Sequence, residues 1–146
     1  MVQVGGRDGG IVAFELATGE VAWTATDDEP GYASPVVAEI GGERIALFFN
    51  RSGLVGIAPA TGEVRLRFPW RARIRASVNA ASPVVIGERV FLSASYGVGA
   101  VMLELGGGQP VPVWQGLESL TSHFTTSVHR DGVLYGLHGR QESRPE

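Results

Sequence analysis

The sequence predicts an all-β protein built from repeated four-stranded antiparallel units, and three observations support this prediction. The 146 residues include 21 Gly and 8 Pro, too many for a protein rich in helices. No stretch shows the apolar periodicity of an amphipathic helix over three turns. Short apolar runs and turn motifs recur along the chain with a period of about 45 residues.

The clearest repeat is a Thr-Gly turn. The stretch "ATGEVAW" (Ala17 to Trp23) returns as "ATGEVRL" (Ala60 to Leu66), and the two glycines are 43 residues apart. Each turn follows a short apolar run, "IVAFEL" or "LVGIAP", and a third run, "AVMLEL", is followed by "GGG". Glycine closes such a hairpin because it adopts the left-handed backbone conformation without steric strain. We therefore expect one such hairpin in each unit.

A second motif also repeats. It precedes the second and third of these turns, and its last copy follows the third. The motif "SPVV" occurs at 34–37 and 82–85, and "TSV" at 126–128 is a degraded third copy. A turn and another apolar run follow each copy: "ERIALFF", "ERVFLSA" and "GVLYGLH". One unit thus holds four short strands, here named A to D from the SPVV strand, which we expect to be innermost. Four strands in such a period are typical of a β-propeller blade.

This frame assigns every strand to a blade. Strands C and D of a first, partial blade are expected at 11–16 and 20–26, with Met1 near the end of a B strand. Two complete blades are expected within 34–70 and 82–115, and strands A and B of a fourth within 125–138. The predicted domain is a partial propeller over 1–142, divided into 1–30, 31–78, 79–118 and 119–142, with 143–146 as a disordered tail.

The predicted fold is therefore a β-propeller fragment of about three four-stranded antiparallel blades, two complete and one partial at each end. Closed propellers usually have about four to eight blades. An open arc leaves apolar blade faces and unpaired strand edges exposed. We expect either further blades in a longer gene product or self-association of identical chains through the exposed blade edges.

The stretch "VAFELATGEVAW" resembles the PQQ-type propeller repeat, in which a docking Trp follows the turn glycine. Trp23 matches this Trp, Leu66 replaces it in the second copy, and Trp114 resumes it in the third. The stretches "YASPVVAEIGGERIALFFNRSGLVGIAPATGEV" and "HFTTSVHRDGVLYGLHGRQE" resemble bacterial PQQ-like propellers of the outer-membrane-assembly-factor type. The resemblance extends over essentially the whole chain. In that family the chain would continue past Glu142 into another hairpin of this type.

The resemblance implies a non-catalytic propeller that acts as a protein-interaction or scaffold module. It also implies a periplasmic or other extracytoplasmic location, although the first residues lack the pattern of a signal sequence. The expected partners are another protein or further propeller blades. A net charge of −3 argues against nucleic acid, and no apolar run approaches the ~20 residues of a membrane-spanning helix. The absence of Cys excludes disulfides, thiolate metal sites and a Cys nucleophile.

The alternative function is a remnant of a quinoprotein dehydrogenase that binds a quinone cofactor or another small polar ligand. The resemblance implies that such an enzyme needs PQQ, a calcium ion and a catalytic Asp. Asp8 and Asp131 lie in expected turns, where Asp is favoured for its local backbone bonds. The acidic stretch 27–29 reads either as a calcium site or as a solvated loop. We expect no catalytic residue, no metal and no PQQ.

The candidate ligand-binding residues come from their position in the repeat. Loops that precede strand A and loops that follow strand B share one end of a propeller, so their polar side chains should line one mouth of the central channel. Seven residues lie there: Tyr32, Asn50, Arg51, Asn79, Tyr96, His123 and Arg140. They either bind a polar ligand or a peptide, or cap strand ends and satisfy loop carbonyls.

An arginine-rich stretch, "RLRFPWRARIR" from Arg65 to Arg75, contains five arginines. Alternate spacing would put them on one face of a strand and form an anionic-ligand or protein-binding surface. The other interpretation is a solvated outer strand followed by a loop, which Phe68, Pro69 and Trp70 anchor by packing. His129 is expected at the opposite end from His123, on the surface.

Overall fold

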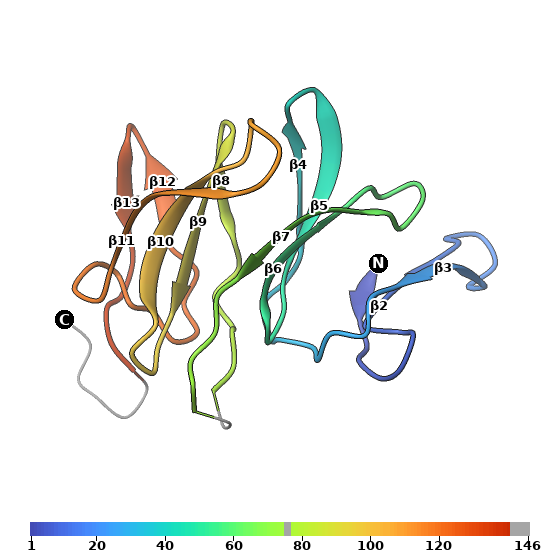
Figure 1. Ribbon diagram of the computed structural model, residues 1–146, viewed down its shortest axis with the longest axis horizontal. Coiled ribbons are helices and arrows are strands. Elements are labelled where there is room, and N and C mark those ends of the chain that lie inside the picture. Colours follow the sequence, from blue (N-terminus) through green and yellow to red (C-terminus); the bar gives the residue numbers. More distant parts are fainter. Residues whose placement is uncertain (75–76, 141–146) are drawn as a thin grey trace.

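The chain folds into β-sheets only, as predicted. The structure is a computed structural model that describes residues 1–74 and 77–140, where it contains thirteen strands and no helix (Figure 1). The predicted disordered tail at 143–146 lies outside the described residues. None of the described residues forms a helix long and apolar enough to cross a membrane.

The strands form four sheets, in which each strand pairs antiparallel with its neighbours in sequence. The first sheet comprises β1 (Val2–Gln3), β2 (Ile11–Phe14) and β3 (Val21–Ala25). The second comprises β4 (Val36–Ile40), β5 (Glu43–Phe49), β6 (Gly53–Ile57) and β7 (Val64–Pro69). The third comprises β8 (Val84–Ile86), β9 (Arg89–Ala94), β10 (Gly99–Glu104) and β11 (Val111–Gly116). The last comprises β12 (Val128–Arg130) and β13 (Val133–Tyr135).

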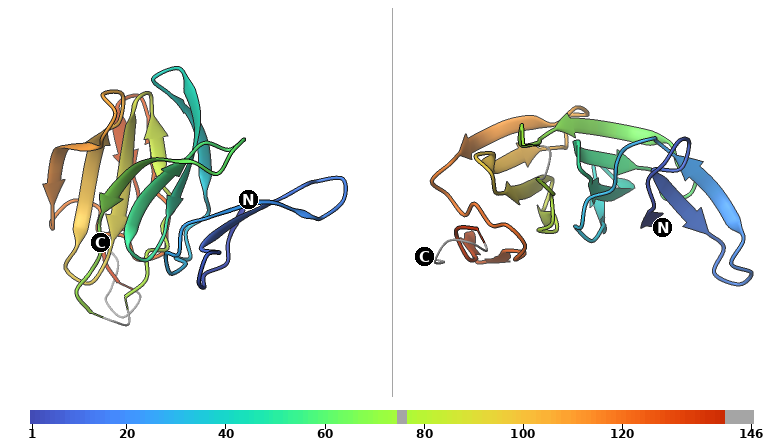
Figure 2. Two further views of the ribbon diagram at one scale, coloured as in Figure 1. Left: turned by 45° about the vertical axis from the view of Figure 1, so that its right-hand side comes forward. Right: turned by 90° about the horizontal axis from the view of Figure 1, so that it is seen from below.

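The sheets stand side by side along an open arc, as the blades of a propeller do. Figure 2 shows β7 and β11 along the outer side of the arc, with β4 and β8 on its inner side. The predicted partial β-propeller, with two four-stranded blades and a partial blade on either side, is therefore confirmed. The SPVV strands β4 and β8 are innermost, as expected from the repeat.

The hydrophobic core consists of three clusters, one between each pair of adjacent sheets. The largest lies between the second and third sheets and includes Phe49, Leu54, Leu92 and Leu103. A cluster around Phe48 joins the first and second sheets, and a third around Phe91 and Met102 lies between the third sheet and the last. The central strands β6 and β10 are buried along nearly their whole length because side chains on both of their faces contact a neighbouring sheet.

The first two sheets are joined by the predicted docking tryptophan. The Trp23 side chain lies against the turn between β6 and β7, and its Nε1 donates a hydrogen bond of 3.1 Å to the Pro59 carbonyl. The ring covers Gly62 so closely that a Cβ there would lie 2.7 Å from Trp23 Cε3. Gly62 also has a φ of +79°, so glycine is required for both conformation and space.

The same joint recurs at the next blade with a smaller side chain. The register places Trp23, Leu66 and Trp114 at equivalent positions on β3, β7 and β11, each next to a bulge in the ladder. Leu66 and Leu105 are buried in one cluster, so Leu66 packs near the turn that follows β10. A hollow of about 330 Å³ borders both leucines. Leu66 therefore makes the contact of a docking Trp without filling the whole space.

Substitution of Gly62 and Gly19 by Ala should separate backbone strain from docking. Both glycines have left-handed φ values, +79° and +74°, so each Ala should cost about 1 kcal/mol of stability through strain. Only at Gly62 would the new Cβ meet Trp23, because nothing lies within 4 Å of a Cβ at Gly19. Gly62→Ala should therefore cost about 1–3 kcal/mol more, as overpacking usually does. Equal free energies of unfolding for the two variants, measured in urea, would contradict the docking contact.

Candidate functional site

The candidate residues lie at one end of the sheets. We call this the loop end: the loops β1–β2, β3–β4, β5–β6, β7–β8, β9–β10 and β11–β12, together with 136–140. The tight turns between the other strand pairs form the opposite, hairpin end. Figure 1 shows the turns β4–β5 and β8–β9 at the top and the connections β5–β6, β7–β8 and β9–β10 at the bottom. All seven candidates lie in loops of the loop end, where the structure divides them into two groups.

In the first group, Asn79 ties three loops together. Its Nδ2 donates to the carbonyls of Asn50, at 2.8 Å, and Trp70, at 3.1 Å. Its own carbonyl accepts from the backbone N–H groups of Tyr32 and Ala33, at 2.8 and 3.2 Å. The Asn79 side chain is buried. Its polar atoms therefore join the loops β3–β4, β5–β6 and β7–β8.

Asn50 holds the turn between β5 and β6 in a similar way. Its Oδ1 accepts from the backbone N–H groups of Ser52 and Gly53, at 2.9 and 3.0 Å. Asn50 is buried, and its Nδ2 has no hydrogen-bond partner in the described part of the chain. Both asparagine side chains thus bond to loop backbone, which is the strand-capping arrangement considered above.

The other members of the first group are Tyr32, which is exposed, and Arg51, which is half-buried. Tyr32 is 71% exposed, although its backbone N–H is held by Asn79. Arg51 Nε lies 3.2 Å from Glu29 Oε2, and its backbone N–H donates to the Glu29 carbonyl. Tyr32 therefore presents its ring to solvent from a fixed backbone.

The acidic stretch 27–29 is partly paired with arginines. Arg67 Nη1 bonds Asp28 Oδ2 at 2.9 Å, and the Asp28 side chain is largely buried. The solvated-loop interpretation is therefore wrong for Asp28, whereas Glu29 contacts Arg51 and stays exposed. No group of three or more His, Asp or Glu side chains that could hold a metal ion occurs among the described residues.

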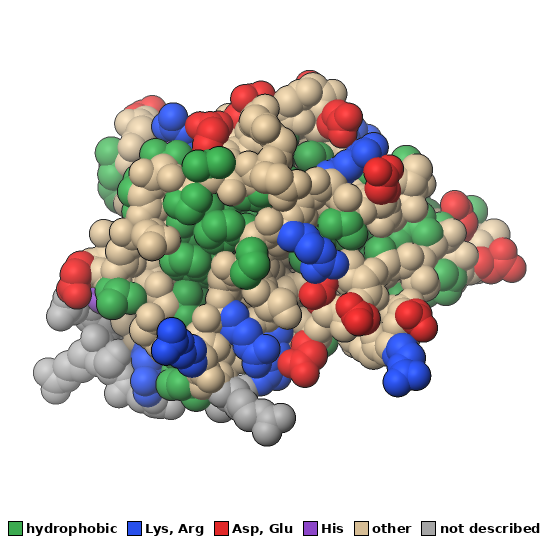
Figure 3. Space-filling model, in the orientation of Figure 1, with side chains coloured by type: hydrophobic (Ala, Val, Ile, Leu, Met, Phe, Trp, Pro, Cys, Tyr) green, Lys and Arg blue, Asp and Glu red, His purple; other side chains and the backbone are tan. Residues whose placement is uncertain are grey.

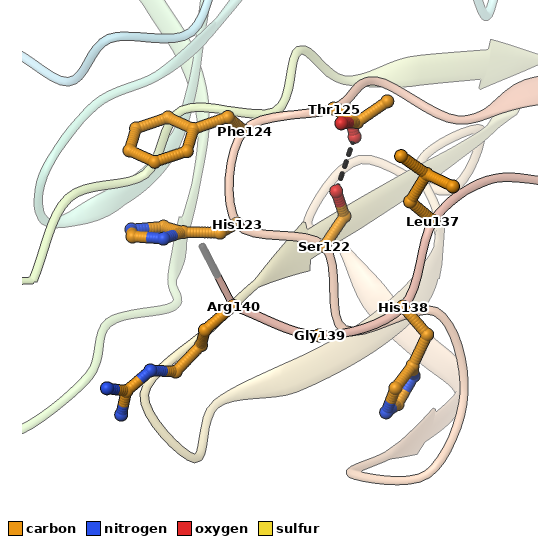
Figure 4. Close-up of a pocket in the computed structure, with 8 residues that line it drawn as sticks. All are labelled: Ser122, His123, Phe124, Thr125, Leu137, His138, Gly139 and Arg140. Carbon is orange, nitrogen blue, oxygen red and sulfur yellow. Dashed lines mark hydrogen bonds between the residues drawn. The ribbon is translucent and has the colours of Figure 1, made fainter. Parts of the chain in front are cut away.

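The second group is a stack of aromatic and cationic side chains. The Tyr96 and His123 rings meet edge to face with centroids 5.0 Å apart. His123 stacks on Phe124 at 3.9 Å, and Arg140 Cζ lies 5.0 Å from the centre of the Tyr96 ring. Figure 4 shows the Phe124 ring above the His123 ring beside the small pocket at which Arg140 also lies. The group thus combines three rings with a guanidinium.

Serine hydroxyls hold this group on the third sheet. The Ser93 hydroxyl donates to the Leu120 carbonyl and accepts from the Ser122 backbone N–H, the latter at 2.7 Å. The Ser122 hydroxyl donates to the Thr125 carbonyl at 2.6 Å. These bonds fix the loop β11–β12 against β9, and with it the positions of His123 and Phe124.

The cavities beside the candidate residues are small, and the larger hollow at the loop end, about 390 Å³ between the β1–β2 and β3–β4 loops, is lined by none of them. The pocket at the His123 stack has a volume of about 170 Å³, and another beside Asn50 has about 110 Å³. Pockets for drug-sized ligands usually have about 300–1,000 Å³. The larger hollows beside Leu66 and beside Trp114 are at the hairpin end and between blades.

The arginine-rich stretch extends from the outer strand β7 into the loop that follows it. Only Arg65 and Arg67 lie in β7, whereas Arg71 and Arg73 lie in the loop after it and Arg75 is outside the described residues. Of the two interpretations of this stretch, the outer strand followed by a loop is therefore the one that forms, and the single strand face with five arginines is wrong. Phe68 and Trp70 anchor this loop by stacking at 5.9 Å and by packing on the largest cluster.

The hairpin end is the more acidic end of the sheets. Figure 3 shows several red side chains along the upper edge of the molecule, with blue ones among them, and blue side chains together low in the middle of the view. The hairpin end carries eight carboxylates and four arginines. The carboxylates are Glu15, Glu20, Glu39, Glu43, Glu63, Glu88, Glu104 and Asp131, and the arginines are Arg44, Arg65, Arg89 and Arg130. At the loop end of the last three sheets, arginines outnumber carboxylates, in contrast to the hairpin end.

Two residues of the second group escaped the sequence analysis. Phe124 follows His123 directly, and its ring is half exposed beside the stack. His138 contacts Thr121, with Nδ1 3.3 Å from the backbone N–H. The repeat frame did not single out His138, because the register aligns it with Phe48 of β5 and aligns Arg140 with Asn50. His129 lies on β12, towards the hairpin end as expected.

The fold and the loop end together define a class: a partial β-propeller whose blades carry PQQ-type repeats and whose loops present aromatic and arginine side chains. The family model described as outer membrane protein assembly factor BamB matches residues 1–142, so the chain belongs to this family. The family resemblance predicted from the sequence is therefore confirmed.

A solved structure agrees with this assignment. The chain is similar to the crystal structure of BamB from Moraxella catarrhalis, with a TM-score of 0.54 and 17% sequence identity. The alignment covers 88% of this chain and 39% of that chain, and at this identity it shows the fold alone. A comparison with curated proteins found no match.

Replacement of Asn79 should test its role as a loop fastener. Asn79→Ala removes both side-chain hydrogen bonds and leaves the Asn50 and Trp70 carbonyls without this donor, which should cost about 1–3 kcal/mol. Tyr32→Ala, at an exposed side chain in the same region, should change stability by no more than about 0.5 kcal/mol. Urea unfolding measures both. A neutral Asn79→Ala variant would mean that the three loops are held in another way.

Proposed function

We propose that this chain is a non-catalytic propeller module that binds a protein partner through its loop end. The observation that carries the proposal is that the seven candidate residues fall into two kinds, those that hold the loops and those that face solvent. Asn50 and Asn79 bond to backbone, whereas Tyr32 and Arg140 are exposed. Tyr and Arg are enriched in protein interfaces and frequent among residues that dominate binding energy.

Further exposed side chains extend this surface. Ile74 and Phe124 are about half exposed, and Arg71 and Arg73 flank Ile74 in the same loop. Apolar and aromatic side chains beside arginines form the usual mixture at a protein-binding surface. Because the cavities beside the candidate residues are small, a polypeptide that lies across this surface fits better than an enclosed small molecule.

The charge of the loop end indicates the kind of partner. Arg71, Arg73 and Arg140 are exposed at the loop end of the last three sheets, so a partner with an acidic contact surface would be steered towards that part of it. The family description, outer membrane protein assembly factor, supports a role in protein assembly and a location outside the cytoplasm. The matched structure is a longer protein, so this chain's own partner is part of the proposal.

Site-specific photo-crosslinking in a Gram-negative host tests the proposed surface. A photoreactive phenylalanine analogue at position 32 should give a discrete crosslinked protein, whereas the same analogue at position 44, at the hairpin end, should not. The double variant Arg71→Glu, Arg73→Glu should reduce the crosslink several-fold through repulsion of an acidic partner, with a weaker effect at high salt.

The matched control is Arg44→Glu, Arg130→Glu, which makes the same change in net charge at exposed positions of the hairpin end. It should leave the crosslink at position 32 unchanged. Crosslinks of equal strength from positions 32 and 44, or the same loss in both double variants, would contradict binding at the loop end.

The alternative, a quinoprotein remnant, is tested with the quinone itself. Addition of PQQ with calcium should neither shift the quinone absorbance saturably nor raise the melting temperature. A ligand at about 100 times its Kd would stabilise the fold by about 2.7 kcal/mol, which a melting curve resolves easily. The control is the same titration with a calcium chelator. A saturable change that requires calcium would favour the enzyme remnant over the scaffold.

A further inference from the structure

The second sheet forms a joint with each of its two neighbours, and the two joints use equivalent positions differently. At the first joint, Trp23 of β3 lies on the turn between β6 and β7, where its ring covers Gly62 and its Nε1 donates to the Pro59 carbonyl. At the second joint, the registers place Leu66 of β7 at the position of Trp23. The turn between β10 and β11 is then the counterpart of the turn that Trp23 covers.

The turn at the second joint is partly uncovered. The registers make Gly108 the counterpart of Gly62. A Cβ at Gly62 would lie 2.7 Å from the Trp23 ring. A Cβ at Gly107 or Gly108 would meet nothing within 4 Å among the described residues. The place that an indole ring fills at the first joint is therefore open at the second.

The Leu66 side chain lies back against its own sheet. A Cβ at Gly56 would lie 2.6 Å from Leu66 Cγ and 3.0 Å from Ile45 Cγ2, so Leu66 occupies the space that this glycine leaves. Leu66 is buried in the largest cluster, although a leucine is smaller than an indole. What remains beside the turn is the hollow of about 330 Å³.

Buried apolar side chains and one ion pair line this hollow. The apolar side chains are those of Ile40, Ile45, Leu66 and Leu105. The ion pair joins Arg65 Nε to Glu43 Oε2 at 3.5 Å, and Arg65 Nη1 also bonds Glu63 at 2.9 Å. Because this guanidinium is already paired with two carboxylates, the hollow offers no free positive charge to an anion. Its lining favours an uncharged, apolar ligand.

We propose that the hollow beside Leu66 binds a small, uncharged, planar aromatic molecule of about the size of indole. The observation that carries the proposal is that an indole ring, that of Trp23, fills the same place at the neighbouring joint. A flat ring between the second sheet and the turn would cover Gly108 as Trp23 covers Gly62. The hollow is within the usual range of about 300–1,000 Å³ for ligand pockets.

The site is formed before any ligand arrives and is internal to the arc. The Gly41 N–H donates to Glu88 Oε1 at 3.2 Å, and the Glu88 carbonyl accepts from the Leu105 N–H at 2.9 Å, so the turns beside the hollow are tied together. A preformed site costs a ligand less free energy of ordering. A blade added at either end of the arc would pack on the first or last sheet and leave this joint unchanged. The hollow lies at the hairpin end, so the inference goes beyond the proposed function.

Titration of the 146-residue chain with indole, followed by the backbone amide signals in NMR spectra, tests the proposal. Saturable shifts are expected at Gly41, Gly106 and Gly108, which line the hollow. The Kd should be on the order of 1 mM or tighter, as suits a ligand of this size. The Gly62 amide is the internal control and should not shift, because Trp23 already covers that turn.

A variant that fills the hollow with the chain's own ring gives the sharpest result. Leu66→Trp should raise the Kd for indole by about tenfold or more and raise the melting temperature by a few degrees, as filling a cavity does. Leu66→Phe is a smaller change that keeps the test valid where the larger ring prevents folding, and it should weaken indole binding several-fold. Val111→Trp adds the same ring at an exposed position of β11 outside the hollow and should bind indole like the parent.

Three results would overturn the proposal. They are shifts that do not saturate, shifts of equal size at Gly62 and Gly108, and folded variants at position 66 that bind indole as tightly as the parent. Each of these results concerns the hairpin end alone. The photo-crosslinks at the loop end report the proposed function separately, so the two proposals fail independently.

Discussion

Burial of sheet faces against one another is the constraint on which the rest of this structure depends. Each four-stranded sheet is apolar on both faces, so it becomes stable only between two neighbours. The clusters around Phe48, Phe49 and Phe91 are the three places where this happens. The curved arrangement of the sheets follows from this packing.

The joints between blades combine this burial with one specific contact each. Trp23 reaches over the turn of the next blade and finds a carbonyl for its Nε1, so a buried polar atom is satisfied where two sheets meet. Leu66 keeps the apolar part of that contact and lacks the hydrogen bond. Repeats of one fold can therefore differ in how firmly neighbouring blades are joined.

The blade pattern could be predicted because each repeat meets the same physical requirement. A hairpin with a left-handed residue recurs in every blade, and glycine supplies it at Gly19 and Gly62. Burial on both faces likewise demands short apolar runs at regular intervals. The turn residue and the apolar runs are close together in the sequence, so both requirements can be recognised directly from the repeat.

The candidate site could be predicted less completely than the fold, for two reasons. The repeat frame located the loop end correctly, since connections of one type share one end of a sheet. It could not tell that Asn79 bonds inward while Tyr32 faces solvent, because both lie in similar loops. The arginine spacing alone left open whether the stretch forms one strand or a strand followed by a loop, and the structure ends β7 at Pro69.

The sequential order of strands within each sheet has a consequence for how such a chain is assembled and altered. Every ladder joins strands that are adjacent in sequence, so pairing within a blade closes only short loops and requires no long-range search. Gain or loss of a segment as long as one repeat then changes the number of blades and leaves all remaining pairings intact. Because strands pair only with their neighbours in sequence, the same feature that keeps folding local also allows whole blades to be added or removed.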